Sequence, residues 1–130
     1  MGRGDEARVV AAFCRWLASE GWTEIETEKA YCDVVARRDR VRLFAEVKGR
    51  TSSPGLDVDT LYGQLLRRAP VVDEADVRLG VVIPVGLRAA ALRVPATTRG
   101  SLRISVFLVD DSGAVTVIAP GTGPDRMEGT

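Results

Sequence analysis

The sequence predicts an α/β fold in which a mixed β-sheet carries helices on its faces. Three observations predict it. An amphipathic helix pattern opens the chain, three short strand patterns follow, and a second helix pattern leads to an apolar run typical of a buried strand. The expected order is α-β-β-β-α-β, followed by a short helix and two further strands.

The first helix is expected over residues 5–20. Val10, Phe13 and Leu17 recur at helical spacing, and Gly21 is a natural stop after the last turn. Glu6 lies one turn before Val10, at the edge of the apolar face.

Three strands are expected next, separated by short turns and alternating in character. Along the third strand one face is apolar, and the other carries Arg42, Phe44, Glu46 and Lys48. The second strand has a matching apolar face formed by Cys32, Val34 and Ala36. These strands are expected at residues 22–28, 31–37 and 41–48.

The second half of the chain starts with a loop of Gly, Ser and Pro. Asp57 or Asp59 can then cap a helix that runs to about Ala69, and Pro70 ends it. The later elements are a strand, a short helix and two strands, at residues 77–83, 87–93, 102–109 and 114–118.

Composition indicates one globular domain. The chain has 130 residues, of which 45% are hydrophobic and 28% charged, and we expect a domain over 1–118 with a flexible tail over 119–130. No stretch approaches the ~20 apolar residues of a membrane span, and no apolar leader is evident, so a cytoplasmic protein is expected. The 18 basic and 18 acidic residues cancel, which argues against an indiscriminate nucleic-acid binder.

The chain has no histidine, which excludes Ser-His-Asp and Cys-His catalysis and nearly all catalytic zinc sites. Its two cysteines, Cys14 and Cys32, lie in apolar segments and are expected to be reduced and buried, with a disulfide as the alternative. Any chemistry must therefore use carboxylates, Lys, Arg, Tyr, hydroxyls or a metal held by oxygen.

The hairpin of the second and third strands brings charged residues together. If paired positions sum to 79, the two apolar faces coincide, and Asp33 lies opposite Glu46. Opposed Cβ atoms are ~5 Å apart, and Lys48 shares their face. Two carboxylates this close repel by roughly a few kcal/mol, which a cation would relieve. Carboxylate oxygens suit Mg²⁺ or Mn²⁺, and the Val47 carbonyl could add a ligand.

Asp33, twelve intervening residues and then Glu46-Val47-Lys48 resemble the motif of the PD-(D/E)xK nuclease superfamily, the restriction-endonuclease-like fold. Glu6 and the Gly21-Trp22 step are similar to its Holliday-junction-resolvase-like and Mrr-like members. The resemblance spans residues 4–85 and implies an αβββαβ core, with the extra strands of this chain following it.

The same resemblance implies metal ligation by Asp33 and Glu46, a catalytic role for Lys48 and a supporting role for Glu6. Many members also carry a Gln on the helix after the motif, and Gln64 is the only Gln in this chain. The motif departs from the family at Cys32, where the motif name has Pro. The chain has 16 Arg and two Lys, yet the motif position is Lys, a better proton acceptor than Arg.

These observations predict a Mg²⁺- or Mn²⁺-dependent nuclease, an endonuclease or exonuclease, that acts on DNA. The resemblance implies products with a 5′-phosphate and a 3′-hydroxyl. The alternative is a catalytically silent nucleic-acid-binding or assembly module of the same fold, and a third is a plain α/β domain with an unrelated ligand. A homodimer or a partner protein could supply specificity. Phosphate contacts are expected from arginines near the motif, namely Arg38, Arg40, Arg42, Arg50, Arg67 and Arg68.

Each assignment has a simpler alternative. Asp33, Glu46 and Lys48 could be a solvated cross-strand ion arrangement, and Glu6 could serve only the helix dipole. Gln64 could be an ordinary surface residue. Arg67 and Arg68 could complement the C-terminal dipole of their helix, and Tyr62 and Trp16 are expected to lie in the core.

Overall fold

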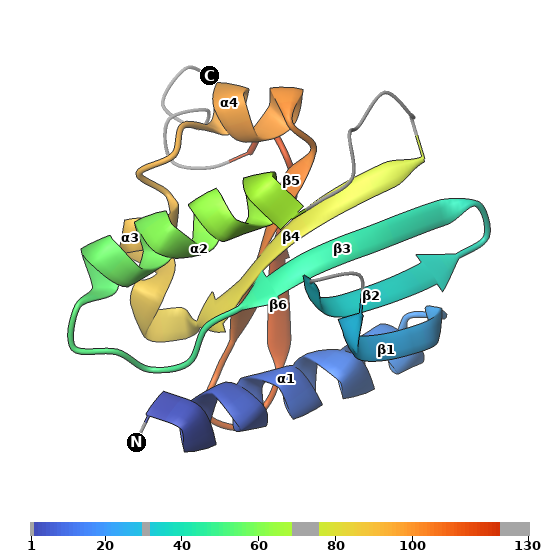
Figure 1. The fold of residues 1–130 in the computed structure, drawn as a ribbon, viewed down its shortest axis with the longest axis horizontal. Helices are drawn as coiled ribbons and strands as arrows, with labels where there is room; N and C mark the ends of the chain where they lie inside the picture. The colour runs from blue at the N-terminus through green and yellow to red at the C-terminus, as the bar shows by residue number, and fades with distance from the viewer. Residues whose placement is uncertain (1, 30–31, 69–75, 123–130) are drawn as a thin grey trace.

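The computed structural model describes residues 2–29, 32–68 and 76–122. They form a six-stranded mixed sheet with strand order β1-β2-β3-β4-β5-β6 (Figure 1). Helix α1 packs on one face of the sheet, and α2 and α3 pack on the other. The expected α/β architecture with a mixed, helix-flanked sheet is confirmed.

The order of the elements matches the predicted order, with one short helix that the sequence reasoning missed. That helix, α4, has the sequence ATTRGS, whose β-branched residues and Gly disfavour a helix prediction. The short helix predicted at 87–93 is a 3₁₀ turn followed by a single helical turn. The elements are α1 (Gly2–Ser19), β1 (Thr23–Lys29), β2 (Cys32–Arg38), β3 (Val41–Val47), α2 (Pro54–Arg68), β4 (Val77–Pro84), η1 (Val85–Leu87), α3 (Arg88–Ala91), α4 (Ala96–Ser101), β5 (Ile104–Val109) and β6 (Val115–Ile118).

Strands β1, β2 and β3 form an antiparallel meander, whereas β4 and β5 run parallel to β3, and β6 is antiparallel to β5. A parallel neighbour requires a crossover connection, and α2 supplies it between β3 and β4. The β2–β3 register pairs Val34 with Ala45 and Arg38 with Val41, so paired numbers sum to 79, as predicted.

From Leu43 to Val47, strand β3 is buried on both faces, including the face that carries Phe44 and Glu46. Phe44 is 4% exposed and Glu46 is 0% exposed. Helix α2 covers this face, and a strand between two helical layers loses the alternation of exposure that a half-buried strand shows.

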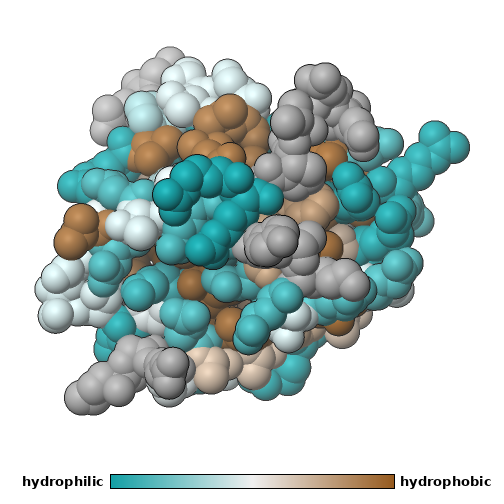
Figure 2. Space-filling view, viewed as in Figure 1, coloured by the Kyte–Doolittle hydropathy of each residue, from teal (hydrophilic) through white to brown (hydrophobic). Residues whose placement is uncertain are grey.

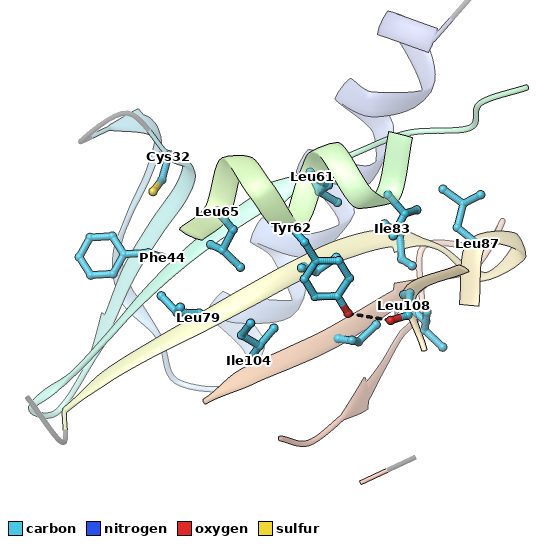
Figure 3. Close-up of a cluster of buried hydrophobic side chains, with 14 of the residues drawn as sticks. Cys32, Phe44, Leu61, Tyr62, Leu65, Leu79, Ile83, Leu87, Ile104 and Leu108 are labelled. Atoms are coloured by element: carbon cyan, nitrogen blue, oxygen red, sulfur yellow. Dashed lines mark hydrogen bonds between the residues drawn. The ribbon is translucent and has the colours of Figure 1, made fainter. Parts of the chain in front are cut away.

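Two hydrophobic clusters lie on the two faces of the sheet. On one face α1 contributes Val9, Phe13 and Leu17. On the other face α2 contributes Leu61 and Leu65. Figure 3 shows them among side chains from the strands, such as Leu79 and Ile104. Phe13 and Leu17 of the predicted apolar stripe are therefore buried, whereas Val10 is only partly buried against the α1-side cluster.

Tyr62 lies in the α2-side cluster, and its hydroxyl donates a hydrogen bond of 2.8 Å to the Ala91 carbonyl (Figure 3). Cys32 belongs to this cluster as well, not to the α1-side cluster with Val34 and Ala36 as expected. Both cysteines are free thiols; Cys32 is buried, and Cys14 is only partly buried.

Helix α2 begins at Pro54, three residues before the earlier of the two predicted caps. Proline is well suited to the first helical position because its missing N–H has no partner there in any case. Asp57 therefore lies in the first turn, where its carboxylate accepts a hydrogen bond from the Thr51 hydroxyl.

The predicted boundary between a domain over 1–118 and a tail over 119–130 stays a prediction. Residues 119–122 form a turn closed by the Thr122 N–H and the Ala119 carbonyl, and residues 123–130 lie outside the described residues. In the described part of the chain no helix has the length and apolar character needed to cross a membrane. Figure 2 shows a mostly hydrophilic face with separate hydrophobic patches.

Candidate active site

A cleft of about 280 Å³ lies at the end of β3, between α1 and α2. Its walls come from the β2–β3 hairpin, the first turns of α1 and one side of α2. All five predicted catalytic residues line it, namely Glu6, Asp33, Glu46, Lys48 and Gln64. Val47 lines it too, and because its side chain packs on the α1 side of the sheet, it presents its backbone to the cleft.

A close approach between α1 and the end of β3 brings Glu6 to the cleft. A Cβ atom at Gly49 would lie 2.5 Å from the Glu6 nitrogen and 2.8 Å from its Cα. Only a residue without a side chain permits this contact. Gly49 therefore allows the chain leaving β3 to pass against the helix that carries Glu6.

Glu46 is a buried carboxylate whose two oxygens differ in their contacts. Its Oε1 accepts a hydrogen bond of 3.1 Å from Arg68 Nη1, and its Oε2 has no hydrogen-bond partner within the described residues. Burial raises the pKa of Glu46 to about 7, the negative charge of Asp33 adds to the rise, and Arg68 opposes it. A buried carboxylate oxygen without a partner is unfavourable unless a proton or cation satisfies it.

Asp33 is half-buried at the start of β2, and its Oδ2 accepts a hydrogen bond of 2.8 Å from the Val47 N–H. This bond ties the carboxylate to the end of β3. The bond holds Asp33 beside Glu46. The predicted register gives the same placement, because Asp33 and Glu46 are the next pair along the hairpin after Val34 and Ala45.

Glu6 and Lys48 interact electrostatically within the same site. Burial raises the pKa of Glu6, the charge of Asp33 adds to the rise, and Lys48 lowers it. The Lys48 backbone N–H donates to the Val82 carbonyl at 3.0 Å, which anchors the residue to β4. Within the described ranges its ammonium group has no hydrogen bond and no ion pair within 4 Å.

One side of α2 forms the opposite wall. Asp57, Thr60, Gln64 and Arg68 all line the cleft, and Gln64 is half-buried there. Sequence reasoning missed Asp57 and Thr60 as cleft residues. Asp57, Thr60, Gln64 and Arg68 are spaced i, i+3, i+7 and i+11, so they lie on one side of the helix. This spacing relative to Gln64 could have identified Asp57 and Thr60.

The six predicted phosphate-binding arginines are not brought together. Arg38 lies at the far end of the hairpin, where it stacks 4.5 Å from the Trp22 ring. Arg40 is in the adjacent turn, and Arg42 lies 5.2 Å from the Phe44 ring. Four residues of extended strand, about 13 Å, separate Arg42 from Glu46.

Of the other three, Arg68 points into the cleft and pairs with Glu46, so it does more than complement the helix dipole. Arg50 lies beside Lys48 in a neighbouring hollow. Arg67 is exposed at the end of α2 and lines neither space.

The cleft residues fit a divalent metal by donor chemistry. Asp33 and Glu46 offer hard oxygen ligands, and the partnerless Oε2 of Glu46 has the character expected of a ligand atom. Among residues 2–29, 32–68 and 76–122, no three His, Cys, Asp or Glu side chains form a group that could hold a metal. The ligand set would therefore be two carboxylates and the Val47 carbonyl, completed by water.

Comparison of the chain with protein-family models, with curated proteins and with solved structures finds no match.

Proposed function

We propose that this chain is a metal-dependent nuclease that hydrolyses phosphodiester bonds, with DNA as the expected substrate. One observation carries the proposal. Glu46 is a fully buried carboxylate whose Oε2 has no hydrogen-bond partner in the described part of the chain, and it lines a cleft together with Asp33 and Lys48. The element order α-β-β-β-α-β and the motif on the β2–β3 hairpin support assignment to the PD-(D/E)xK superfamily.

Asp33, Glu46 and the Val47 carbonyl would hold Mg²⁺ or Mn²⁺. When bound, such an ion lowers the pKa of a water molecule and polarises a phosphodiester. Asp33 is already oriented by the Val47 N–H, so one ligand needs little rearrangement. Glu46 would bind the ion in its ionised form through Oε2, the oxygen that Arg68 does not contact.

Lys48 is the residue best suited to the reacting phosphate. Its backbone is anchored to β4, and its ammonium group has no hydrogen-bond partner in the described part of the chain, so it is available to a ligand. It can orient the attacking water or stabilise the charge that develops on the phosphate. Glu6 lies near Lys48, whose charge opposes the rise in the pKa of the Glu6 carboxyl, and Gln64 can hydrogen-bond water or substrate from the α2 wall.

Thermal unfolding with EDTA, Mg²⁺ or Mn²⁺, with and without a DNA oligonucleotide, tests the proposal. A metal at 100 times its dissociation constant stabilises the fold by about 2.7 kcal/mol. The gain should vanish in Glu46→Gln and persist in Glu20→Gln, a matched change at an exposed site. Lys48→Ala should keep the metal response and lose cleavage. A metal response that survives Glu46→Gln would contradict the proposal.

The second candidate is a catalytically silent nucleic-acid-binding or assembly module. The ion pair between Arg68 and Glu46 favours it, because Arg68 already offsets part of the buried charge without a metal. This candidate predicts no metal-dependent stabilisation even with DNA present. The same unfolding experiment therefore separates the two.

A further inference from the structure

A second and wider hollow of about 830 Å³ lies beside the carboxylate cleft, and Lys48 lines both. The two spaces differ in charge. The cleft is lined by four acidic side chains and two basic ones, whereas this hollow is lined by Arg8, Lys48 and Arg50 against a single acid, Asp5. The hydroxyl-bearing residues Thr51 and Ser52 complete it. An anion is therefore favoured in the hollow more than in the cleft.

The Arg50 backbone is fixed in this hollow, and its guanidinium makes two long ion pairs but no hydrogen bond within the described residues. Its backbone N–H donates to Asp5 Oδ2 at 2.5 Å, and the preceding residue, Gly49, is pressed against α1. Its guanidinium is 71% exposed and lies 3.8 Å from Asp5 and 3.7 Å from Asp111. Both distances are too long for hydrogen bonds, so the side-chain N–H groups stay available to a ligand.

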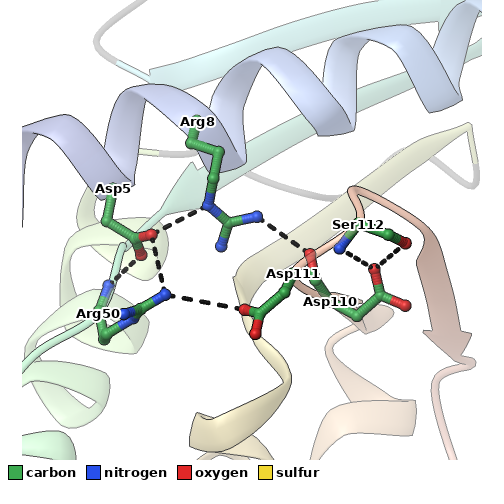
Figure 4. A network of polar contacts seen from close by, with 6 residues as sticks. All are labelled: Asp5, Arg8, Arg50, Asp110, Asp111 and Ser112. Atoms are coloured by element: carbon green, nitrogen blue, oxygen red, sulfur yellow. Dashed lines mark hydrogen bonds and ion pairs between the residues drawn. The ribbon is translucent and has the colours of Figure 1, made fainter.

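Asp5 and Arg8 hold this arrangement in place, as Figure 4 shows. Asp5 accepts a hydrogen bond of 3.0 Å from Arg8 Nε, and Arg8 Nη1 donates to the Asp110 carbonyl at 3.0 Å. Burial alone would raise the pKa of Asp5, but hydrogen bonds from the Arg50 backbone and Arg8 lower it below 3.8. The network joins α1, the loop after β3 and the β5–β6 turn.

We infer that this hollow binds a phosphate of the substrate strand adjacent to the phosphodiester held in the carboxylate cleft. Arg50 is the principal donor, Lys48 lies between the two phosphates, and Asp5 is a positioning residue. The inference rests on the proposed function. Lys48 and Arg50 are two residues apart, at most ~7 Å along the chain, so one strand can contact both. A guanidinium matches phosphate oxygens in geometry and charge.

The strand would then run from the end of β3 past Lys48 towards the first turn of α1 and the β5–β6 turn. This path excludes the arginines at the tip of the β2–β3 hairpin. It also requires a phosphate next to the bond that is cut, so a substrate with a single phosphodiester should be poor.

The test measures binding of a fluorescent ten-nucleotide oligothymidylate in EDTA over a series of salt concentrations. Arg50→Gln should weaken binding about tenfold, as expected for loss of a charge-assisted hydrogen bond. It should also reduce the slope of log affinity against log salt by about 0.7, the value for one phosphate contact on a single strand. Arg88→Gln, an equal loss of charge at an exposed position on α3, is the matched control.

Inorganic phosphate distinguishes a strand phosphate from a free one. If the hollow takes strand phosphates, the oligonucleotide binds in an Arg50-dependent way and phosphate competes only at much higher concentration. Stabilisation by phosphate that depends on Arg50, without oligonucleotide binding, would overturn the strand assignment. Equal effects of Arg50→Gln and Arg88→Gln, or no binding by the unaltered protein, would overturn the whole inference.

Failure here is distinguishable from failure of the proposed function. Strand binding is measured in EDTA and depends on Arg50, whereas the metal response is measured as a shift in thermal unfolding and depends on Glu46. If the Glu46-dependent metal response is present but Arg50 does not contribute to strand binding, the proposed function stands. That result would refute only the phosphate subsite.

Discussion

The charge on Glu46 should make the metal-free protein less stable as the pH rises. In the folded protein the pKa of this carboxyl is raised from 4.5 to about 7, mainly by burial. Ionising it in the fold therefore costs about 3 kcal/mol more than in the unfolded chain. Between pH 4.5 and about 7 the folded state holds an extra proton, so the free energy of unfolding must fall as the pH increases.

Glu46→Gln removes this dependence, because glutamine has the shape of the protonated carboxyl and does not ionise. In EDTA the two proteins should be similarly stable near pH 4.5. By pH 8 the variant should be more stable by about 3 kcal/mol, equivalent to about 10 °C in Tm for a domain of this size. Urea unfolding at pH 4.5, 6, 7 and 8 measures the difference, in which the other titrating groups cancel.

Parallel stability curves for the two proteins would refute the reasoning, because they would mean that Glu46 ionises as easily in the fold as in the unfolded chain. Glu20→Gln should follow the unaltered protein at every pH. Adding Mg²⁺ at 1,000 times its dissociation constant should reverse the order at pH 8, because the ion then adds about 4.1 kcal/mol of stability only to the protein that has the Glu46 carboxylate.

Three further substitutions test separate features. Arg68→Gln removes the guanidinium that competes with a metal ion for the Glu46 carboxylate, so calorimetric titration should show Mn²⁺ binding several-fold tighter. Unchanged or weaker Mn²⁺ binding would contradict this competition. Gly49→Ala places a Cβ 2.5 Å from the Glu6 nitrogen, so thermal unfolding should show a loss of about 2 kcal/mol or more, and an unchanged Tm would refute the close approach. Tyr62→Phe should lose about 1 kcal/mol by urea unfolding and retain the proposed metal response, because Tyr62 donates its hydrogen bond to the Ala91 carbonyl on α3 and not to a proposed metal ligand.

The sequence predicted the elements well because their signals are local. The spacing of Val10, Phe13 and Leu17 belongs to one helix, and the alternation along β3 belongs to one strand. The β2–β3 register followed from two facing apolar patterns, which fix the pairing of a tight hairpin without knowledge of the rest of the fold. That register was sufficient to place Asp33 beside Glu46.

The environment of the site was harder to predict. Alternation alone indicated a polar face for Glu46, and only the packing of α2 on that face buries it and raises its pKa. The same packing brings Arg68 into contact with Glu46. The hairpin arginines were expected near the site because they are close in sequence, but an extended strand carries Arg42 about 13 Å away from it.

By itself the sequence determined the order of the elements other than α4, the hairpin register and the placement of Asp33, Glu46 and Lys48 in one cleft. These depend on hydrogen bonds and apolar patterns within a few tens of residues. Only the tertiary structure decided that Glu6 meets Lys48 across Gly49, and that Asp5 fixes Arg50 beside the cleft. Such contacts join segments more than forty residues apart, and their geometry depends on how helices pack on the sheet, which no local pattern specifies.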